Sequence, residues 1–263
     1  MSDTICNLWS YLIDGKSTGE VLFLLAASLM AGLARGFAGF GAALIFMPTV
    51  SSVVGPQAAA AILLIIDSIA ALGMIPDSWR RSDHRAVGTM AIGSLIGIPL
   101  GTAVLAFLDP HIVRWVIVTV VACLFGLLVS GWRFRGQSTT GTIVGVGLFT
   151  GFCTGTSQIG GPPLLAYWLG TDVSGVKLRA NVVLYFAIST VISLVTYSVG
   201  GLITWRVFGL SIVVGPVYAL GLFTGTRAFG LASETVFRRA CYSLIILSVI
   251  LGLPLLDPIL HRH

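Results

Sequence analysis

The sequence predicts an all-α polytopic membrane protein with two inverted repeats, each a broken, re-entrant helical hairpin plus three transmembrane helices. Three observations predict this fold: an apolar composition, two apolar segments too long for one crossing, and an internal duplication. The 263 residues are 56% hydrophobic and 10% charged, with a mean hydropathy of +0.98, whereas soluble domains carry about 25% charged residues. This composition excludes a soluble fold, a disordered chain, a disulfide scaffold and a nucleic-acid binder.

Apolar stretches separated by short polar loops follow one another along the chain, at residues 20–54, 57–76, 86–108, 111–131, 141–170, 180–199, 203–225 and 236–256. Six of them have the length of one helical crossing, about 20 residues. We expect the first stretch to be retained, because residues 1–19 include Asp3, Asp14 and Lys16 and lack the pattern of a signal peptide.

Two of the stretches are too long for a single crossing. As continuous helices, residues 20–54 would extend about 52 Å and residues 141–170 about 45 Å, against a hydrocarbon core of about 30 Å. Glycine-rich sequence interrupts both of them, at residues 36–41 and 155–163. Each stretch is therefore predicted to form two half-length helices that meet at a break.

The two breaks belong to an internal duplication. Their glycines align at a constant offset of 119 residues: Gly32 with Gly151, Gly36 with Gly155, and Gly41 with Gly160. Further along, residues 97–102 match residues 221–226 at an offset of 124. The predicted organisation is an extracytoplasmic segment 1–19, a first repeat 20–131, a cytoplasmic linker 132–140, a second repeat 141–256 and a tail 257–263.

The loop lysines and arginines distinguish a hairpin from a straight crossing at each break. If each broken segment crosses once, these cations divide eight to six between the two sides. If each is a hairpin, they divide ten to four, which the positive-inside rule favours. The ten are Arg80, Arg81, Arg85, Arg133, Arg135, Lys177, Arg179, Arg227, Arg238 and Arg239, and the four are Lys16, Arg114, Arg206 and Arg262. Hairpins invert the second repeat and place both termini outside the cytoplasm of an inner-membrane protein.

The paired breaks predict a binding site for an anion. Irregular backbone at membrane depth is tolerated inside protein or around a wet cavity, and matched breaks indicate a transport site. Half-helices beginning near Ala42 and Pro162 would direct backbone N–H groups and a partial positive charge at the breaks. Close packing explains a single glycine but not the overlong segments. The predicted site residues are Arg35, Gly36, Gly39, Phe40, Gly41, Thr154, Thr156, Ser157, Gln158, Gly160 and Gly161.

Arg35 and Asp67 are the two charged residues deep in the apolar stretches, where charges are usually functional. Arg35 could bind or gate an anion, form a structural ion pair with Asp67, or reach an interface. Asp67 could carry a coupling proton or neutralise Arg35. Lys177 and Arg179 lie at the start of a predicted helix. We interpret them first as cations that set the orientation of the chain in the membrane, and second as groups that attract anions to the entrance of the site.

Other chemistries lack their key residues. The four histidines, His84, His111, His261 and His263, lie in predicted loops or at the C-terminus, and the four cysteines form no CxxC pair. No phosphate-binding GxxxxGK[ST] motif is present. We therefore predict no catalytic residue, no metal, no cofactor and no ATP-driven pump, and hence no enzyme.

The two breaks also carry a family resemblance. The segments Gly36-Phe-Ala-Gly-Phe-Gly-Ala-Ala-Leu-Ile-Phe-Met-Pro48 and Gly151-Phe-Cys-Thr-Gly-Thr-Ser-Gln-Ile-Gly-Gly-Pro-Pro163 resemble the sulfite exporter TauE/SafE family, and the resemblance extends over about 20–256. It implies secondary transport, often outward, of sulfite, organosulfonates or related small sulfur-containing anions.

Together these inferences predict an exporter that works by alternating access at a midplane site between the two repeats. An inside-negative potential would favour anion export by about 2.3 kcal/mol per charge per 100 mV. A passive anion channel and a non-transporting membrane scaffold are the alternatives. The expected partners are the anion and the lipid bilayer, without nucleic acid, and an oligomer is compatible with the sequence.

Overall fold

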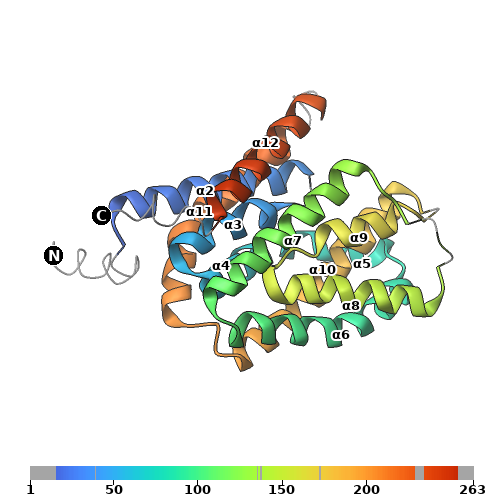
Figure 1. The fold of residues 1–263 in the computed structure, drawn as a ribbon. Coiled ribbons are helices and arrows are strands. Elements are labelled where there is room, and N and C mark those ends of the chain that lie inside the picture. Colours follow the sequence, from blue (N-terminus) through green and yellow to red (C-terminus); the bar gives the residue numbers. More distant parts are fainter. Residues whose placement is uncertain are drawn as a thin grey trace. The chain divides into compact units, whose positions relative to one another are not determined.

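The computed structural model describes residues 16–38, 40–134, 136, 138–171, 173–228 and 234–253. In these ranges the secondary structure is helical and contains no strand (Figure 1). The helices are α2 (Thr18–Ala38), α3 (Ala42–Val54), α4 (Pro56–Ala71), η1 (Leu72–Met74), α5 (Ile75–Arg81), α6 (His84–Phe107), α7 (Pro110–Ser130), α8 (Thr140–Ser157), α9 (Gly161–Trp168), α10 (Gly175–Val199), α11 (Trp205–Ala228) and α12 (Glu234–Gly252).

The predicted all-α polytopic membrane class is confirmed, and the inversion of the two repeats stays a prediction. Among the described residues, five helices are long and apolar enough to cross a membrane, or six if the bent pair α4 and α5 forms one span. Both overlong stretches are broken where expected, because α3 begins at Ala42 and α9 begins at Gly161. The sequence missed α5, whose polar residues resemble a loop but include an Arg81–Asp77 ion pair at 2.9 Å along one helix face.

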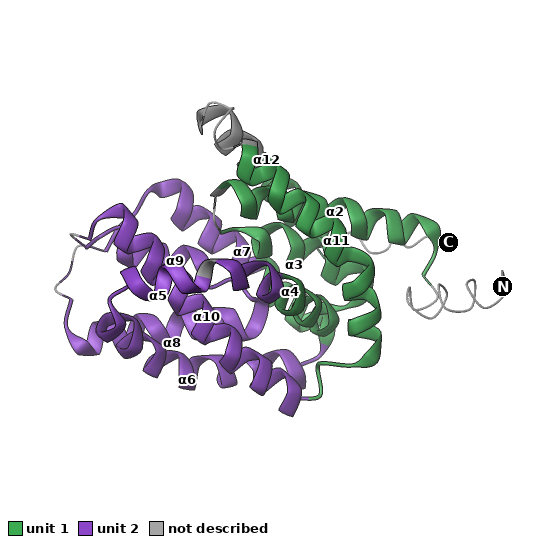
Figure 2. Ribbon diagram, turned by 180° about the vertical axis from the view of Figure 1, so that it is seen from behind, with its two compact units in different colours: residues 1–66, 110–118, 201–263 green, residues 67–109, 119–200 purple. Residues whose placement is uncertain are grey.

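The chain divides into two compact units (Figure 2). Unit 1 comprises residues 1–66, 110–118 and 201–263, and unit 2 comprises residues 67–109 and 119–200. Unit 1 therefore contains one broken helix pair, α2 and α3, and unit 2 contains the other, α8 and α9. Each unit takes helices from both predicted repeats, so the compact units and the sequence repeats are different divisions of the chain.

A glycine seam joins α6 to α8 in unit 2. Its glycines recur every four residues, at Gly93, Gly97 and Gly101 on α6 and at Gly147, Gly151 and Gly155 on α8. A methyl group on Gly97 would overlap the Leu148 carbonyl, and one on Gly101 would overlap the Phe152 carbonyl. The contacts advance together along both helices, so α6 and α8 run parallel with their backbones in contact, as small residues permit in membranes.

Unit 1 repeats this seam between α2 and α11. A methyl group on Gly221 would overlap the Leu29 carbonyl, and one on Gly225 would overlap the Leu33 carbonyl. Gly221 and Gly225 are equivalent to Gly97 and Gly101 at the offset of 124, and Leu29 and Leu33 are equivalent to Leu148 and Phe152 at the offset of 119. The contacts of Gly221 with Leu29 and of Gly225 with Leu33 are therefore the same as those of Gly97 with Leu148 and of Gly101 with Phe152. The duplication is therefore visible in the packing, and each seam pairs a helix of one repeat with a helix of the other.

The segment formed by α8 and α9 turns back on itself. The Phe134 N–H, ahead of α8, donates to the Ala166 carbonyl near the end of α9 at 2.9 Å. The Tyr167 hydroxyl of α9 lies 3.2 Å from Ser138 Oγ, which also precedes α8. The segment therefore begins and ends at the same end of unit 2, which is the geometry that the hairpin prediction requires of this half.

Arg114 differs from its predicted place in a loop. It lies in the second turn of α7, is 8% exposed, and its Nη2 donates to the Gly252 carbonyl at the end of α12 at 3.4 Å. A cation that binds a helix C-terminus has a structural role, which the sequence analysis did not foresee for Arg114. The predicted orientation, which rests on the division of ten cations against four, stays a prediction.

The seam predicts opposite effects for two glycines of α6. Gly97→Ala should destabilise the protein by about 1–3 kcal/mol, because the added methyl group meets backbone that cannot easily move. Gly88→Ala should be neutral or stabilising by up to about 1 kcal/mol, because nothing lies within 4 Å of the added methyl group. Thermal unfolding in detergent measures both, and equal losses in the two variants would contradict the seam.

Candidate anion site

The break between α8 and α9 is built around Gln158. Gln158 has the left-handed conformation, with φ 57° and ψ 18°, directly after α8 ends at Ser157. Its N–H donates to the Thr154 carbonyl at 2.8 Å, and the Ile159 N–H donates to the Cys153 carbonyl at 3.3 Å. These bonds close the C-terminus of α8 in the manner that is usual for a glycine, so the local conformation is held despite the side chain.

Three hydroxyls that the sequence suggested as donors bond within α8. Thr154 Oγ1 donates to the Thr150 carbonyl at 2.8 Å, Thr156 Oγ1 to the Phe152 carbonyl at 2.9 Å, and Ser157 Oγ to the Cys153 carbonyl at 3.0 Å. In this arrangement their protons are used, and their oxygens can accept hydrogen bonds but not donate them. All three residues are buried.

The Gln158 amide is held by a tyrosine of α10. Tyr197 Oη donates to the Gly155 carbonyl at 2.9 Å and therefore accepts from Gln158 Nε2 at 3.1 Å. This network fixes the amide orientation, because a flipped amide would place two acceptors together. The amide nitrogen carries a second hydrogen beyond the one bonded to Tyr197, so a partly buried donor remains at the break.

The N-terminus of α9 offers fewer N–H groups than a usual helix. Pro162 and Pro163 occupy its first turn and have no N–H, although their fixed φ suits a helix start. The Leu164 N–H donates to the Gly160 carbonyl at 3.4 Å. The start of α9 therefore provides the N–H groups of Gly160 and Gly161, two residues that the sequence analysis selected.

The break between α2 and α3 depends on Gly41. Its φ of 96° is a conformation that glycine adopts readily and other residues rarely adopt. The Gly41 carbonyl accepts from the Leu44 N–H at 3.1 Å and starts α3. Phe40 beside it is partly buried, while Gly39 lies outside the described residues. The break is short, and α3 follows it at once with ten buried residues.

Arg35 and Gly36 lie in the last part of α2. Arg35 is partly buried in the final turn, where a cation is favoured by the helix dipole. Gly36 packs against the Leu222 carbonyl of α11 with no room for a side chain, so its place in the seam already explains it. Asp67 is partly buried in α4. The alternative roles of Arg35 and Asp67 stay predictions.

Comparison with known proteins identifies the family. The family model described as Sulfite exporter TauE/SafE matches residues 24–251, a range that includes both breaks. The chain belongs to the TauE/SafE sulfite exporter family. The family is one of membrane exporters rather than enzymes. A relative from Cupriavidus necator, named probable sulfite/organosulfonate exporter TauE, is 24% identical over 214 residues, which cover 79% of this chain and 84% of the relative. No solved structure matches the chain.

This TauE/SafE protein also has a polar stripe that the sequence analysis missed. Polar residues occupy every fourth position of α10, namely Asn181, Tyr185, Ser189, Ser193 and Tyr197, and each is at most 1% exposed. The stripe extends about 24 Å along the helix. The four-residue spacing of these polar residues in an apolar helix is a signal that the sequence contains.

One end of unit 2 in this TauE/SafE protein is held by Asp83. Its side chain caps α6 by accepting from the Ala86 N–H at 3.1 Å, and its own N–H donates to Asn181 Oδ1 at 2.7 Å. Lys177 Nζ lies 3.1 Å from Asp83 Oδ2. The Ala86 N–H and then Lys177 hold the pKa of Asp83 below its usual value of 3.8. Lys177 thus links the starts of α10 and α6.

Two substitutions separate the backbone role of Gln158 from its side-chain role. Gln158→Gly should leave the protein about 1 kcal/mol more stable than Gln158→Ala, because glycine relieves the left-handed strain and both variants lose the bond to Tyr197. Thermal unfolding of the two variants measures the difference. Equal stability would show that the backbone conformation at residue 158 is not strained.

The lowered pKa of Asp83 predicts a stabilising effect that depends on pH. Because the folded-state pKa lies below the unfolded value, the stabilisation is present above about pH 4 and is lost as the pH falls through the folded-state pKa. Asp83→Asn should remove this pH-dependent contribution to the stability of the folded protein. Lys177→Gln should keep part of it, since the hydrogen bond from the Ala86 N–H remains and is the largest single cause of the lowered pKa. Unfolding temperatures between pH 6 and pH 3 measure it, and parallel curves for wild type and Asp83→Asn would refute it.

Proposed function

We propose that this protein exports sulfite, organosulfonates or related small sulfur-containing anions across the inner membrane by alternating access. The family match over residues 24–251 carries the proposal, since it includes both broken helix pairs. The name of the Cupriavidus necator relative supports the substrate class. The predicted ten-to-four division of loop cations supports an orientation with both termini outside the cytoplasm.

The chemistry at the breaks suits a small anion. Arg35 brings a permanent cation to the end of α2, and Gln158 brings an amide hydrogen to the end of α8. Gly160 and Gly161 add N–H groups at the positive end of α9. We infer that Arg35 and Gly41 provide anion-binding groups at the break of unit 1, and that Gln158, Gly160 and Gly161 provide them at the break of unit 2. Gly36, Thr154, Thr156 and Ser157 support the helices that hold these groups.

Two rival functions make different predictions. A passive anion channel would use the same groups without closing the path, and it would show single-channel currents far above carrier turnover. A membrane scaffold would need no anion binding at all. The membrane potential favours export of an anion, so the proposed exporter needs no coupling ion, and Asp67 then has a structural role.

Arg35 provides the test of this proposal. In proteoliposomes loaded with sulfite, Arg35→Ala should raise the KM at least tenfold, because a charge-assisted hydrogen bond contributes about 1.5–3 kcal/mol. Arg35→Lys should restore part of the flux. Arg81→Ala is the matched control, since Arg81 is exposed and pairs with Asp77 at 2.9 Å on α5, outside both broken helix pairs. Wild-type flux in both Arg35→Ala and Gln158→Ala would remove the breaks from the binding site.

A further inference from the structure

Three buried hydroxyls, two in the polar stripe of α10 and one on α8, lack hydrogen-bond partners in the described part of unit 2. Ser189 Oγ and Ser193 Oγ of α10, and Thr150 Oγ1 of α8, are fully buried and have no hydrogen-bond partner in the described part of unit 2. Buried polar groups are nearly always paired, because leaving one without a partner is costly. Three such hydroxyls on two neighbouring helices therefore call for a ligand.

Tyr185 lies near two of these hydroxyls, those of Thr150 and Ser189, while Ser193 is one turn further along α10. Ser94 Oγ of α6 donates to the Gly147 carbonyl at 3.2 Å, so at 2.7 Å it accepts from the Tyr185 hydroxyl. The hydroxyls of Thr150 and Ser189 lie near the same phenol without the geometry of a good hydrogen bond. Side chains from α6, α8 and α10 thus meet around Tyr185.

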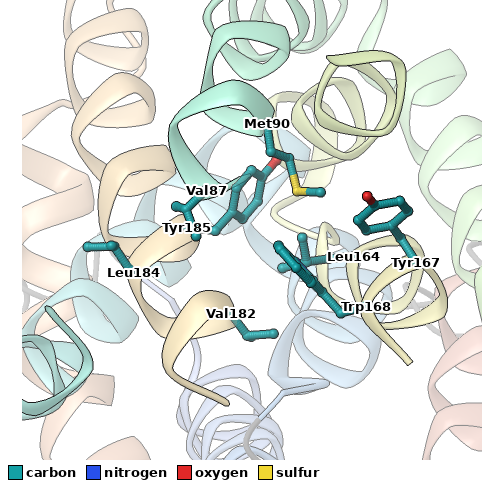
Figure 3. Close-up of a cluster of buried hydrophobic side chains, with 8 residues drawn as sticks. All are labelled: Val87, Met90, Leu164, Tyr167, Trp168, Val182, Leu184 and Tyr185. Carbon is teal, nitrogen blue, oxygen red and sulfur yellow. The ribbon is translucent and has the colours of Figure 1, made fainter. Parts of the chain in front are cut away.

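Apolar side chains enclose this polar centre on one side. Figure 3 shows Tyr185 in a cluster with Val87 and Met90 of α6 and with Leu164 and Trp168 of α9. These residues are at most 3% exposed. Charges and hydrogen bonds act more strongly where water is excluded, so even neutral donors can bind an ion in such a setting.

The polar groups available here favour an anion over a cation. The nearby carbonyls of Gly147, Thr150 and Gly155 already accept hydrogen bonds from side chains. The helices α6, α8, α9 and α10 contain no aspartate or glutamate. Asn181 Nδ2 and Trp168 Nε1, which can only donate, are also buried without a hydrogen-bond partner within the described ranges. The interior of unit 2 therefore has an excess of donors.

We propose that Thr150, Ser189 and Ser193 form an uncharged anion-binding site inside unit 2, which takes the oxygen atoms of a sulfite or sulfonate group. This inference rests on the proposed function for the identity of the anion. Thr150 also packs against Gly160, where a side chain would collide with Thr150 and Thr154, so the positive end of α9 adjoins the site. The stripe on α10 gives the anion further donors along the helix.

Serine-to-alanine substitutions test the site on the purified full-length protein. The double variant Ser189→Ala/Ser193→Ala should unfold at the wild-type temperature or higher without ligand, because it removes two unpaired hydroxyls. Its affinity for sulfite, from thermal-shift titration, should fall at least tenfold. The matched control is Ser198→Ala on the same helix, where the exposed hydroxyl donates to the Leu194 carbonyl at 2.7 Å. The control should bind sulfite like the wild type.

The titration includes sulfite, sulfoacetate, phosphate and chloride, so that the site and the proposed function can fail separately. If phosphate stabilises the wild type, sulfite does not, and the double variant loses the phosphate effect, the site stands and the proposed substrate is wrong. Wild-type sulfite affinity in the double variant would overturn the site while leaving the exporter proposal intact. A wild type that no anion stabilises would also overturn the site.

Discussion

The contact between helix backbones along the glycine seams is the interaction on which each unit depends. Lipid chains are as apolar as leucine, so helices in a membrane gain little from hydrophobic burial against one another and rely on close packing. In unit 2, Gly97 and Gly101 let α6 approach the carbonyls of Leu148 and Phe152 on α8. Because α8 ends at the break, the seam also fixes where Gln158 and the start of α9 lie. A change in the seam would therefore move the candidate site.

The sequence allowed the helices and breaks to be predicted because both depend on local chemistry. The length of each apolar stretch can be read directly and shows that one crossing is too short for it. Gly41 and the two prolines after Gly161 then determine the backbone conformation within a few residues of each break. The choice of partner helices could not be predicted, because every seam glycine is equally able to approach any backbone. Only the structure shows that α2 packs on α11 and α6 on α8, and that these two pairings are equivalent under the duplication.

The candidate site likewise has residues that could be predicted from the sequence and hydrogen bonds that could not. Arg35 and Gln158 could be selected as rare polar groups beside a break, but the bonds of Thr154, Thr156 and Ser157 could not. A threonine or serine in a helix can donate to its own backbone or to a ligand, and the sequence does not distinguish these cases. The partner of the Gln158 amide, Tyr197, is 39 residues away, so no local pattern reveals it.

The two breaks differ in charge at one equivalent position, since the offset of 119 aligns Arg35 with Thr154. Unit 1 thus has a permanent cation where unit 2 has a hydroxyl bonded to its own helix. A buried cation binds an anion strongly, but both charges must lose their water, and release is then slow. The Thr154 hydroxyl already donates its proton to the Thr150 carbonyl, so of these two equivalent positions only that of Arg35 offers an anion a donor. The duplication therefore preserves the position of the break but not its charge. An anion at the break of unit 1 would meet a cation, and one at the break of unit 2 would meet neutral groups such as the Gln158 amide.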